Sequence, residues 1–133
     1  MGMDTEFVVY TGGEGEWLYT LDDFEELLKA APSRHKDSVL MYWRNNRDLN
    51  ELVQTRYFEK LRAEHALSAS DAVGFNSLAM RLGRKDLRRI LKSLGRFNVV
   101  GDEKKMWKCT KRAVKDALLL TRFGLTVYYR VSF

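Results

Sequence analysis

The segment that most constrains the fold is residues 125–133, "LTVYYRVSF", because its side chains alternate strictly between two faces. One face carries Leu125, Val127, Tyr129, Val131 and Phe133. The other face carries Thr126, Tyr128, Arg130 and Ser132. A period of two predicts a half-buried β-strand, since successive side chains of a strand point to opposite faces. The chain must therefore supply a sheet for this strand to join, and we expect that sheet to come from the N-terminal part.

The N-terminal part contains the patterns of both strands and helices. The runs "EFVVY" and "EWLYT" are rich in β-forming residues and are separated by "TGGEG", which predicts a hairpin. Thr20 and Asp48 are placed to cap helices that begin after them. The predicted elements are, in order, a β-hairpin over 6–20, a helix over 21–30, a strand over 38–43 and a long helix over 48–66.

Charge divides the chain into two parts at the small polar segment 68–74, "SASDAVG". The formal net charge of +5 conceals an acidic first half, with 8 basic and 13 acidic residues in 1–66, and a basic remainder, with 15 basic and 5 acidic residues. Such asymmetry suggests that one half binds a polyanion. We expect an acidic N-terminal lobe, 1–67, and a basic lobe, 68–133, that together form one compact domain.

The basic half contains an amphipathic helix, predicted within residues 81–97, "RLGRKDLRRILKSLGRF". Its apolar residues Leu87, Ile90, Leu91 and Leu94 have the spacing of one helix face. The opposite face is almost entirely cationic, and only Asp86 compensates it. Solvated helices usually mix charges of both signs, so this face is predicted to bind an anion. The alternative is an ordinary solvated basic face.

Three consecutive segments carry a resemblance to a known family. They are "SLAMRLG", then "RKDLRRILKSLGRFNVV", then "GDEKKMWKC". Over about residues 75–110 the chain resembles the winged helix-turn-helix DNA-binding family, of the small prokaryotic, plasmid or archaeal-virus type. The resemblance implies a short helix before Gly83, a recognition helix after it, and a β-hairpin wing over 98–109. The turn of this hairpin is predicted over 101–105, and Thr110 is placed to cap a further short amphipathic helix over 111–120. The expected fold class is therefore α+β, with a winged helix-turn-helix unit joined to the N-terminal hairpin, helix and strand.

The resemblance also implies a function, the binding of double-stranded DNA by a transcriptional regulator or architectural factor. The recognition helix would lie in the major groove and the wing would contact the flanking backbone. The protein would act as a homodimer whose interface comes from the long helix or the last strand. The residues expected to bind nucleic acid are Arg84, Lys85, Arg88, Arg89, Lys92, Arg96, Lys104, Lys105, Lys108 and Lys111.

Two other functions remain open from the sequence. The acidic N-terminal lobe could bind a basic partner, or the basic surface of its own chain, which would make the protein an interaction module. Alternatively, Tyr128 and Arg130 on the polar face of the last strand could form a platform for RNA. Trp107 could stack on a base, although we interpret it as a core residue that packs against the basic helix.

Catalytic and metal-binding patterns are weak. The two histidines, His35 and His65, are far apart in the chain, and the acidic residues of 22–26 would need further carboxylates to bind Mg²⁺. We therefore expect no enzyme activity, no cofactor, no metal and no small-molecule substrate. With Cys109 as its single cysteine, the chain forms no internal disulfide, which suggests a reducing, cytoplasmic setting. No apolar run approaches the roughly 20 residues that cross a bilayer, so no membrane association is expected.

Overall fold

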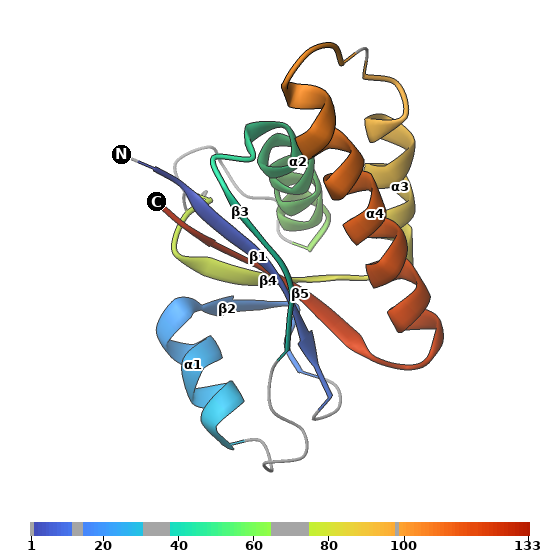
Figure 1. Ribbon diagram of the computed structural model, residues 1–133. Helices are drawn as coiled ribbons and strands as arrows, with labels where there is room; N and C mark the ends of the chain where they lie inside the picture. The colour runs from blue at the N-terminus through green and yellow to red at the C-terminus, as the bar shows by residue number, and fades with distance from the viewer. Residues whose placement is uncertain (1, 12–14, 31–37, 65–74, 98) are drawn as a thin grey trace.

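Five strands form one antiparallel sheet, in the order β2-β4-β5-β1-β3 (Figure 1). The computed structural model describes residues 2–11, 15–30, 38–64, 75–97 and 99–133. The strands are β1 (Asp4–Tyr10), β2 (Leu18–Thr20), β3 (Ser38–Arg44), β4 (Leu78–Leu82) and β5 (Thr126–Ser132). Strands β1, β2 and β3 come from the acidic half of the chain and β4 and β5 come from the basic half, so the two halves share one sheet.

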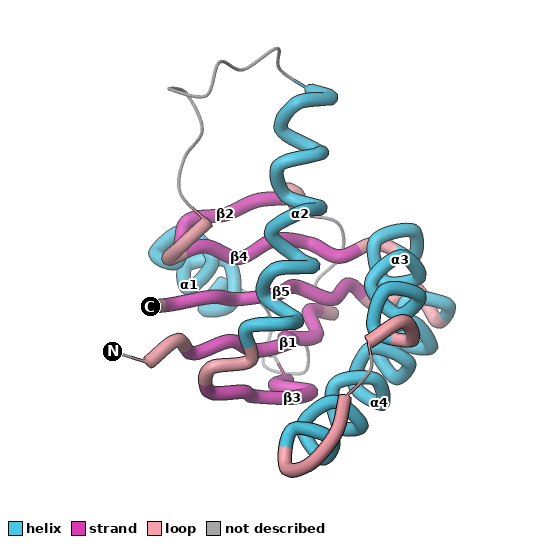
Figure 2. The backbone as a smooth tube through the Cα atoms, turned by 90° about the horizontal axis from the view of Figure 1, so that it is seen from above, coloured by secondary structure: helices cyan, strands magenta, loops and turns pink. Residues whose placement is uncertain are grey.

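Helices cover both faces of the sheet (Figures 1 and 2). They are α1 (Leu21–Ala30), α2 (Arg47–Glu64), α3 (Arg84–Leu94) and α4 (Glu103–Arg122). On one face α2, α3 and α4 pack over the larger hydrophobic core, and on the other face α1 covers a smaller one. The result is a mixed α+β fold, as the sequence predicts.

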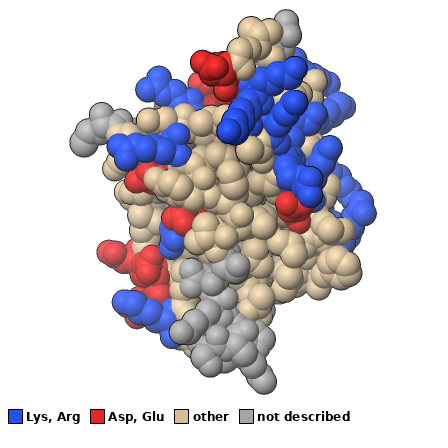
Figure 3. Space-filling view, in the orientation of Figure 1, with Lys and Arg blue, Asp and Glu red and all other residues tan. Residues whose placement is uncertain are grey.

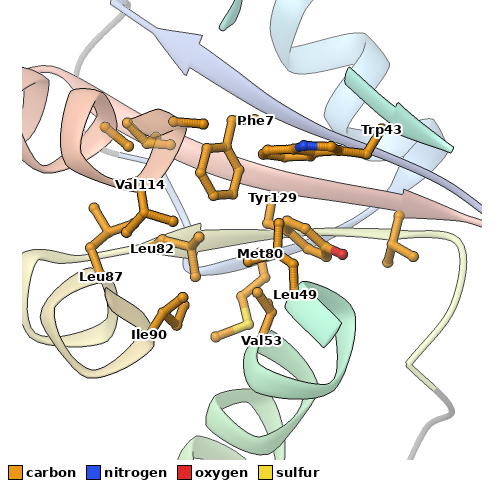
Figure 4. Packing of buried hydrophobic residues seen from close by; sticks show 14 of the residues in the cluster. Phe7, Trp43, Leu49, Val53, Met80, Leu82, Leu87, Ile90, Val114 and Tyr129 are labelled. Carbon is orange, nitrogen blue, oxygen red and sulfur yellow. The ribbon is translucent and has the colours of Figure 1, made fainter. Parts of the chain in front are cut away.

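The larger core is centred on aromatic side chains of the sheet (Figure 4). The Phe7 ring lies 5.0 Å from that of Trp43 and 6.0 Å from that of Tyr129, centroid to centroid, in edge-on arrangements. Side chains from the three helices close over these rings, namely Leu49 and Val53 from α2, Leu87 and Ile90 from α3, and Val114 from α4. This shared core fixes α3 and α4 relative to the sheet.

Several local predictions are confirmed. The last strand is β5, and it pairs with the N-terminal strand β1 as expected. Thr20 caps α1, where its Oγ1 accepts a hydrogen bond of 3.1 Å from the backbone N–H of Asp23. The long helix begins at Arg47, slightly earlier than predicted, because the side chain of Asn46 rather than Asp48 accepts the hydrogen bond from the N–H of Leu49.

The predicted N-terminal hairpin is wrong. Both of its strands exist, but β1 pairs with β3 and β5, whereas β2 lies at the other edge of the sheet beside β4. The seven-residue β1 has both edges taken by strands of equal length, which leaves none for the three-residue β2. Long-range pairing therefore outweighs the local turn signal.

The elements expected on either side of the basic helix are also wrong. Residues 78–82 form strand β4 instead of a positioning helix, since this segment is buried in the sheet at Leu78, Ala79, Met80 and Leu82. Residues 103–109 belong to helix α4 instead of the turn and second strand of a wing. In the predicted wing strand 98–100, residues 99 and 100 are not in a strand, and residue 98 lies outside the described residues. The winged helix-turn-helix arrangement is therefore not confirmed.

The expected dimer interface needs one correction. β5 lies between β4 and β1, so both of its edges are already paired and it offers none to a second copy. In the described part of the chain the two outer strands of the sheet are β2 and β3. The predicted lobe boundary at 68–74 lies outside the described residues.

Candidate nucleic-acid interface

The basic helix α3 and the following helix α4 form an antiparallel helical hairpin that is fastened at both ends. At one end the indole Nε1 of Trp107 donates to the carbonyl of Leu94 at 2.9 Å. At the other end the guanidinium of Arg84 donates to the carbonyl of Thr121 at 3.3 Å. Buried residues of both helices join the larger core. These contacts fix the two helices of the α3–α4 hairpin relative to each other, and each helix has one face exposed to solvent.

Cations occupy the outward faces of both helices. In α3 and the turn after it they recur every three or four residues, at Lys85, Arg88, Lys92 and Arg96, all exposed. All ten residues predicted to bind nucleic acid lie on the hairpin or in that turn, and all except the partly buried Lys111 are exposed. Figure 3 shows Lys and Arg side chains gathered over the part of the surface where Figure 1 places α3 and α4.

Three further cations on α4 were missed from the sequence. Arg112, Lys115 and Arg122 are exposed on the same helix as Lys104 and Lys108. The sequence pattern predicts two separate elements here, a wing over 98–109 and a short helix after Thr110. The signal that would have found them is the continuous helical spacing of basic residues from 104 to 122, which passes through Thr110 without interruption.

Few carboxylates neutralise this surface. Within the described ranges, the only ion pairs made by cations of the hairpin are Arg89 with Glu59, at 3.2 Å, and Arg112 with Asp116, at 3.5 Å. The exposed cations without a carboxylate at ion-pair distance in these ranges are Arg84, Lys85, Arg88, Lys92, Arg96, Lys104, Lys105, Lys108, Lys115 and Arg122. The surface therefore carries a net positive charge along both helices.

The one acidic residue of α3, Asp86, faces inward and compensates none of the exposed cations. Its carboxylate accepts hydrogen bonds from Arg56 Nε at 2.8 Å, Lys60 Nζ at 2.7 Å and the N–H of Gly83 at 3.0 Å. Burial alone would raise the pKa of Asp86, but the hydrogen bonds from Lys60, Gly83 and Arg56 and the charge of Lys60 outweigh it and lower the pKa below its usual value. Asp86 thus links α3 to α2 through two ion pairs, and it stabilises the N-terminus of α3 through the hydrogen bond from Gly83.

Trp107 has a structural position. Its half-buried ring packs against the larger core, and Lys111 Nζ lies 4.4 Å from the ring centroid, within the range of a cation–π contact. With its indole N–H bound to Leu94, the ring is held in the hairpin and is not presented for base stacking.

We expect Trp107→Phe to lower the free energy of unfolding by about 1–2 kcal/mol, because the carbonyl of Leu94 keeps only the N–H of Phe97 as a donor and the core loses apolar contact. Affinity for nucleic acid should change less than about twofold, since the charges are unaltered. Urea unfolding followed by circular dichroism, beside a binding titration, measures both. A large loss of affinity at unchanged stability would instead indicate base stacking.

The expected RNA platform on the last strand is not available. Tyr128 is buried beneath α1, where its hydroxyl donates to the carbonyl of Glu16 at 2.9 Å, and burial raises its pKa. Arg130 is held by Glu6 at 3.0 Å and by Glu25 at 3.1 Å. Neither side chain is presented to a ligand, because both serve the packing of α1 on the sheet.

The acidic helix α1 lies on the opposite face of the sheet from the hairpin (Figure 1). Its carboxylates Asp22, Asp23, Glu25 and Glu26 are exposed, and Figure 3 shows acidic side chains gathered on that side. Asp22 and Asp23 occupy the first turn, where negative charge complements the helix dipole. In this structure α1 therefore does not cover the basic surface of its own chain.

Comparison with family models, curated proteins and solved structures finds no match. The basic surface must therefore be interpreted from its own residues. Among the described residues no helix is both long and apolar enough to pass through a bilayer. In the same residues no three His, Cys, Asp or Glu side chains converge as metal ligands would.

Proposed function

We propose that this protein binds double-stranded DNA through the cationic surface of the α3–α4 hairpin. The observation that carries the proposal is the concentration of exposed, uncompensated Lys and Arg on two helices fixed side by side. Such a surface costs electrostatic energy in the free protein, and a polyanion relieves that cost. Release of counterions from DNA adds a further driving force.

The dimensions of the surface suit a duplex. Lys104 and Arg122 are 18 residues apart in one helix, which corresponds to about 27 Å at 1.5 Å per residue. That length spans about eight base pairs at 3.4 Å each. Cations spaced three or four residues apart lie about 5–6 Å from one another along the helix, so several can contact phosphates of the same backbone.

The cationic surface of the hairpin suits single-stranded nucleic acid less well than a duplex. Proteins that bind single strands usually offer exposed aromatic rings on which bases stack. Here Phe7, Tyr128 and Tyr129 of the sheet are fully buried, and the exposed face of α3 carries no aromatic residue. Among the described residues the exposed aromatic rings are Tyr42, Phe123 and Phe133, which belong to three separate parts of the fold, and only Phe123 adjoins the hairpin. We therefore favour a duplex that is held mainly by its phosphates.

The packing of α3 favours an architectural role over base reading. α3 contacts α2 on one side and α4 on the other, so it does not stand clear of the surface as a recognition helix in a major groove does. Contacts made by both helices would fall mainly on phosphates, which fix position without reading sequence. We infer modest sequence selectivity, and we keep the homodimer as a prediction.

The test is a salt series with a labelled duplex of random sequence, comparing wild type with an Arg88→Ala/Lys108→Ala variant that removes one cation from each helix. Each lost phosphate contact lowers the slope of log K against log salt by about 0.9, so we expect the slope to fall by about 1.8. Affinity near 0.1 M salt should fall about 10- to 100-fold.

The matched control is Lys29→Ala/Arg62→Ala, which removes two exposed cations outside the hairpin and should leave the slope nearly unchanged. Single-stranded DNA and duplex RNA as competitors separate the other nucleic-acid classes. Equal losses in the two double variants, or no binding by wild type at low salt, would refute the proposal.

A further inference from the structure

A groove of about 380 Å³ opens between α2 and α3, beside the hairpin surface. Four cations line it, Arg56 from α2 and Arg89, Lys92 and Arg96 from α3 and its following turn, against one carboxylate, Glu59. Its volume falls within the roughly 300–1,000 Å³ of ligand pockets. Charge therefore makes this groove selective for an anion.

Ion pairs hold one wall of the groove in place. The Arg56 side chain is 11% exposed, and its guanidinium donates to Asp86 at 2.8 Å and to Glu59 at 2.7 Å. Arg89 binds the same Glu59 oxygen at 3.2 Å. Because two arginines share Glu59, this carboxylate does not neutralise the rest of the groove.

The other cations of the groove are free to bind a ligand. Lys92 and Arg96 are exposed, and no described carboxylate lies at ion-pair distance from either. Both line the same groove, Lys92 from the last turn of α3 and Arg96 from the turn after it, so the ammonium and guanidinium groups can approach one ligand together. Ser93, which also lines the groove, can add a hydroxyl donor.

We infer that this groove is a binding site for a phosphate group, with Lys92 and Arg96 as the direct donors and Arg56 and Arg89 as a preorganised positive wall. Guanidinium and ammonium groups form charge-assisted hydrogen bonds with phosphate oxygens. The phosphate belongs either to a nucleic-acid backbone, in which case the inference rests on the proposed function, or to a free nucleotide or polyphosphate. The phosphate chemistry is the same for both sources.

The test is an NMR titration of the full chain with inorganic pyrophosphate. We expect shifts confined to residues that line the groove, and about 10- to 100-fold weaker binding in Lys92→Ala/Arg96→Ala, which removes two charged donors. The Arg88→Ala/Lys108→Ala variant loses the same charge outside the groove and should bind pyrophosphate within about twofold of wild type. Equal weakening in both variants, shifts spread over α4, or no binding would overturn the inference.

A second arm separates the source of the phosphate. Displacement of pyrophosphate by a short DNA duplex would assign the groove to a backbone phosphate. Simultaneous binding of both ligands would assign it to a free nucleotide or polyphosphate. Binding of pyrophosphate by a protein that binds no duplex would refute the proposed function while leaving the phosphate site established.

Discussion

Replacement of Asp86 by Asn should lower the free energy of unfolding by about 3–5 kcal/mol, the usual cost of removing one partner from a buried ion pair. The Asp86 side chain is 3% exposed and forms ion pairs with Arg56 and Lys60, whose side chains are 11% and 28% exposed. The variant leaves both cations without this carboxylate. It also weakens the hydrogen bond that the side chain accepts from the N–H of Gly83 at the N-terminus of α3. Native domains are stable by only about 5–15 kcal/mol, so the loss is a large share of the total.

The same carboxylate makes stability depend on pH. The pKa of Asp86 is lower in the folded protein than in the unfolded chain, where it is about 3.9. Its contribution is therefore fully present above the unfolded value and is lost as the pH falls through the lower, folded value. Urea unfolding at neutral and at acidic pH should show this loss in wild type, and Asp86→Asn should lack that part of it.

The control for Asp86 is Asp116→Asn, which breaks an exposed pair with Arg112 on the surface of α4. Exposed pairs of this kind contribute little, so stability should be nearly unchanged. If Asp86→Asn were as mild as this control, the buried ion pairs between α2 and α3 would not hold the hairpin in place.

Replacement of Phe7 by Ala should cost about 3–5 kcal/mol, the range for deleting a buried aromatic ring. Phe7 is fully buried and meets Trp43 and Tyr129 edge-on, at the point where β1 is covered by the helices (Figure 4). These neighbours belong to strands on either side of β1, and the sheet cannot close around the missing ring, so a cavity remains.

Denaturant unfolding measures the effect, with Phe133→Ala as the control at a position that is 56% exposed. The control should change the free energy of unfolding by less than about 0.5 kcal/mol. A cost below about 1 kcal/mol for Phe7→Ala would contradict the arrangement of the larger core, because a ring that is deleted so cheaply cannot lie at its centre.

Elements with a clear local pattern could be predicted from the sequence. The alternation of β5, the cap and apolar stripe of α1, and the amphipathic spacing of α3 are each visible over a few consecutive residues. The prediction that β5 is half buried is wrong, because Tyr128 on its second face is also buried, in the smaller core with α1. β4 was misassigned because "LAMRL" is buried on both faces, and such a run has no period that separates a strand from a buried helix. The N-terminal hairpin was misassigned because Leu18 pairs with Met80, a partner that no local signal indicates.

For the candidate site, the residue types could be predicted from the sequence but their arrangement in space could not. Its cations could be found from the sequence because charge is read directly from residue type, and an exposed location is the default for Lys and Arg. Their arrangement on two helices could not, because Gly101 and Asp102 suggested a wing turn and Thr110 suggested a helix start. The groove depends on Arg56 and Glu59 of α2 meeting α3, a contact set by tertiary packing alone.

The position of β5 also has a consequence during synthesis on the ribosome. β1 and β3 can pair early, and β2 can find β4 later, but these two pairs are joined only through β5, which is synthesised after all of them. Until β5 emerges, β1 and β4 each have an edge that no strand occupies, and such edges favour association between nascent chains. The final closure of the sheet therefore waits for the insertion of its central strand, β5.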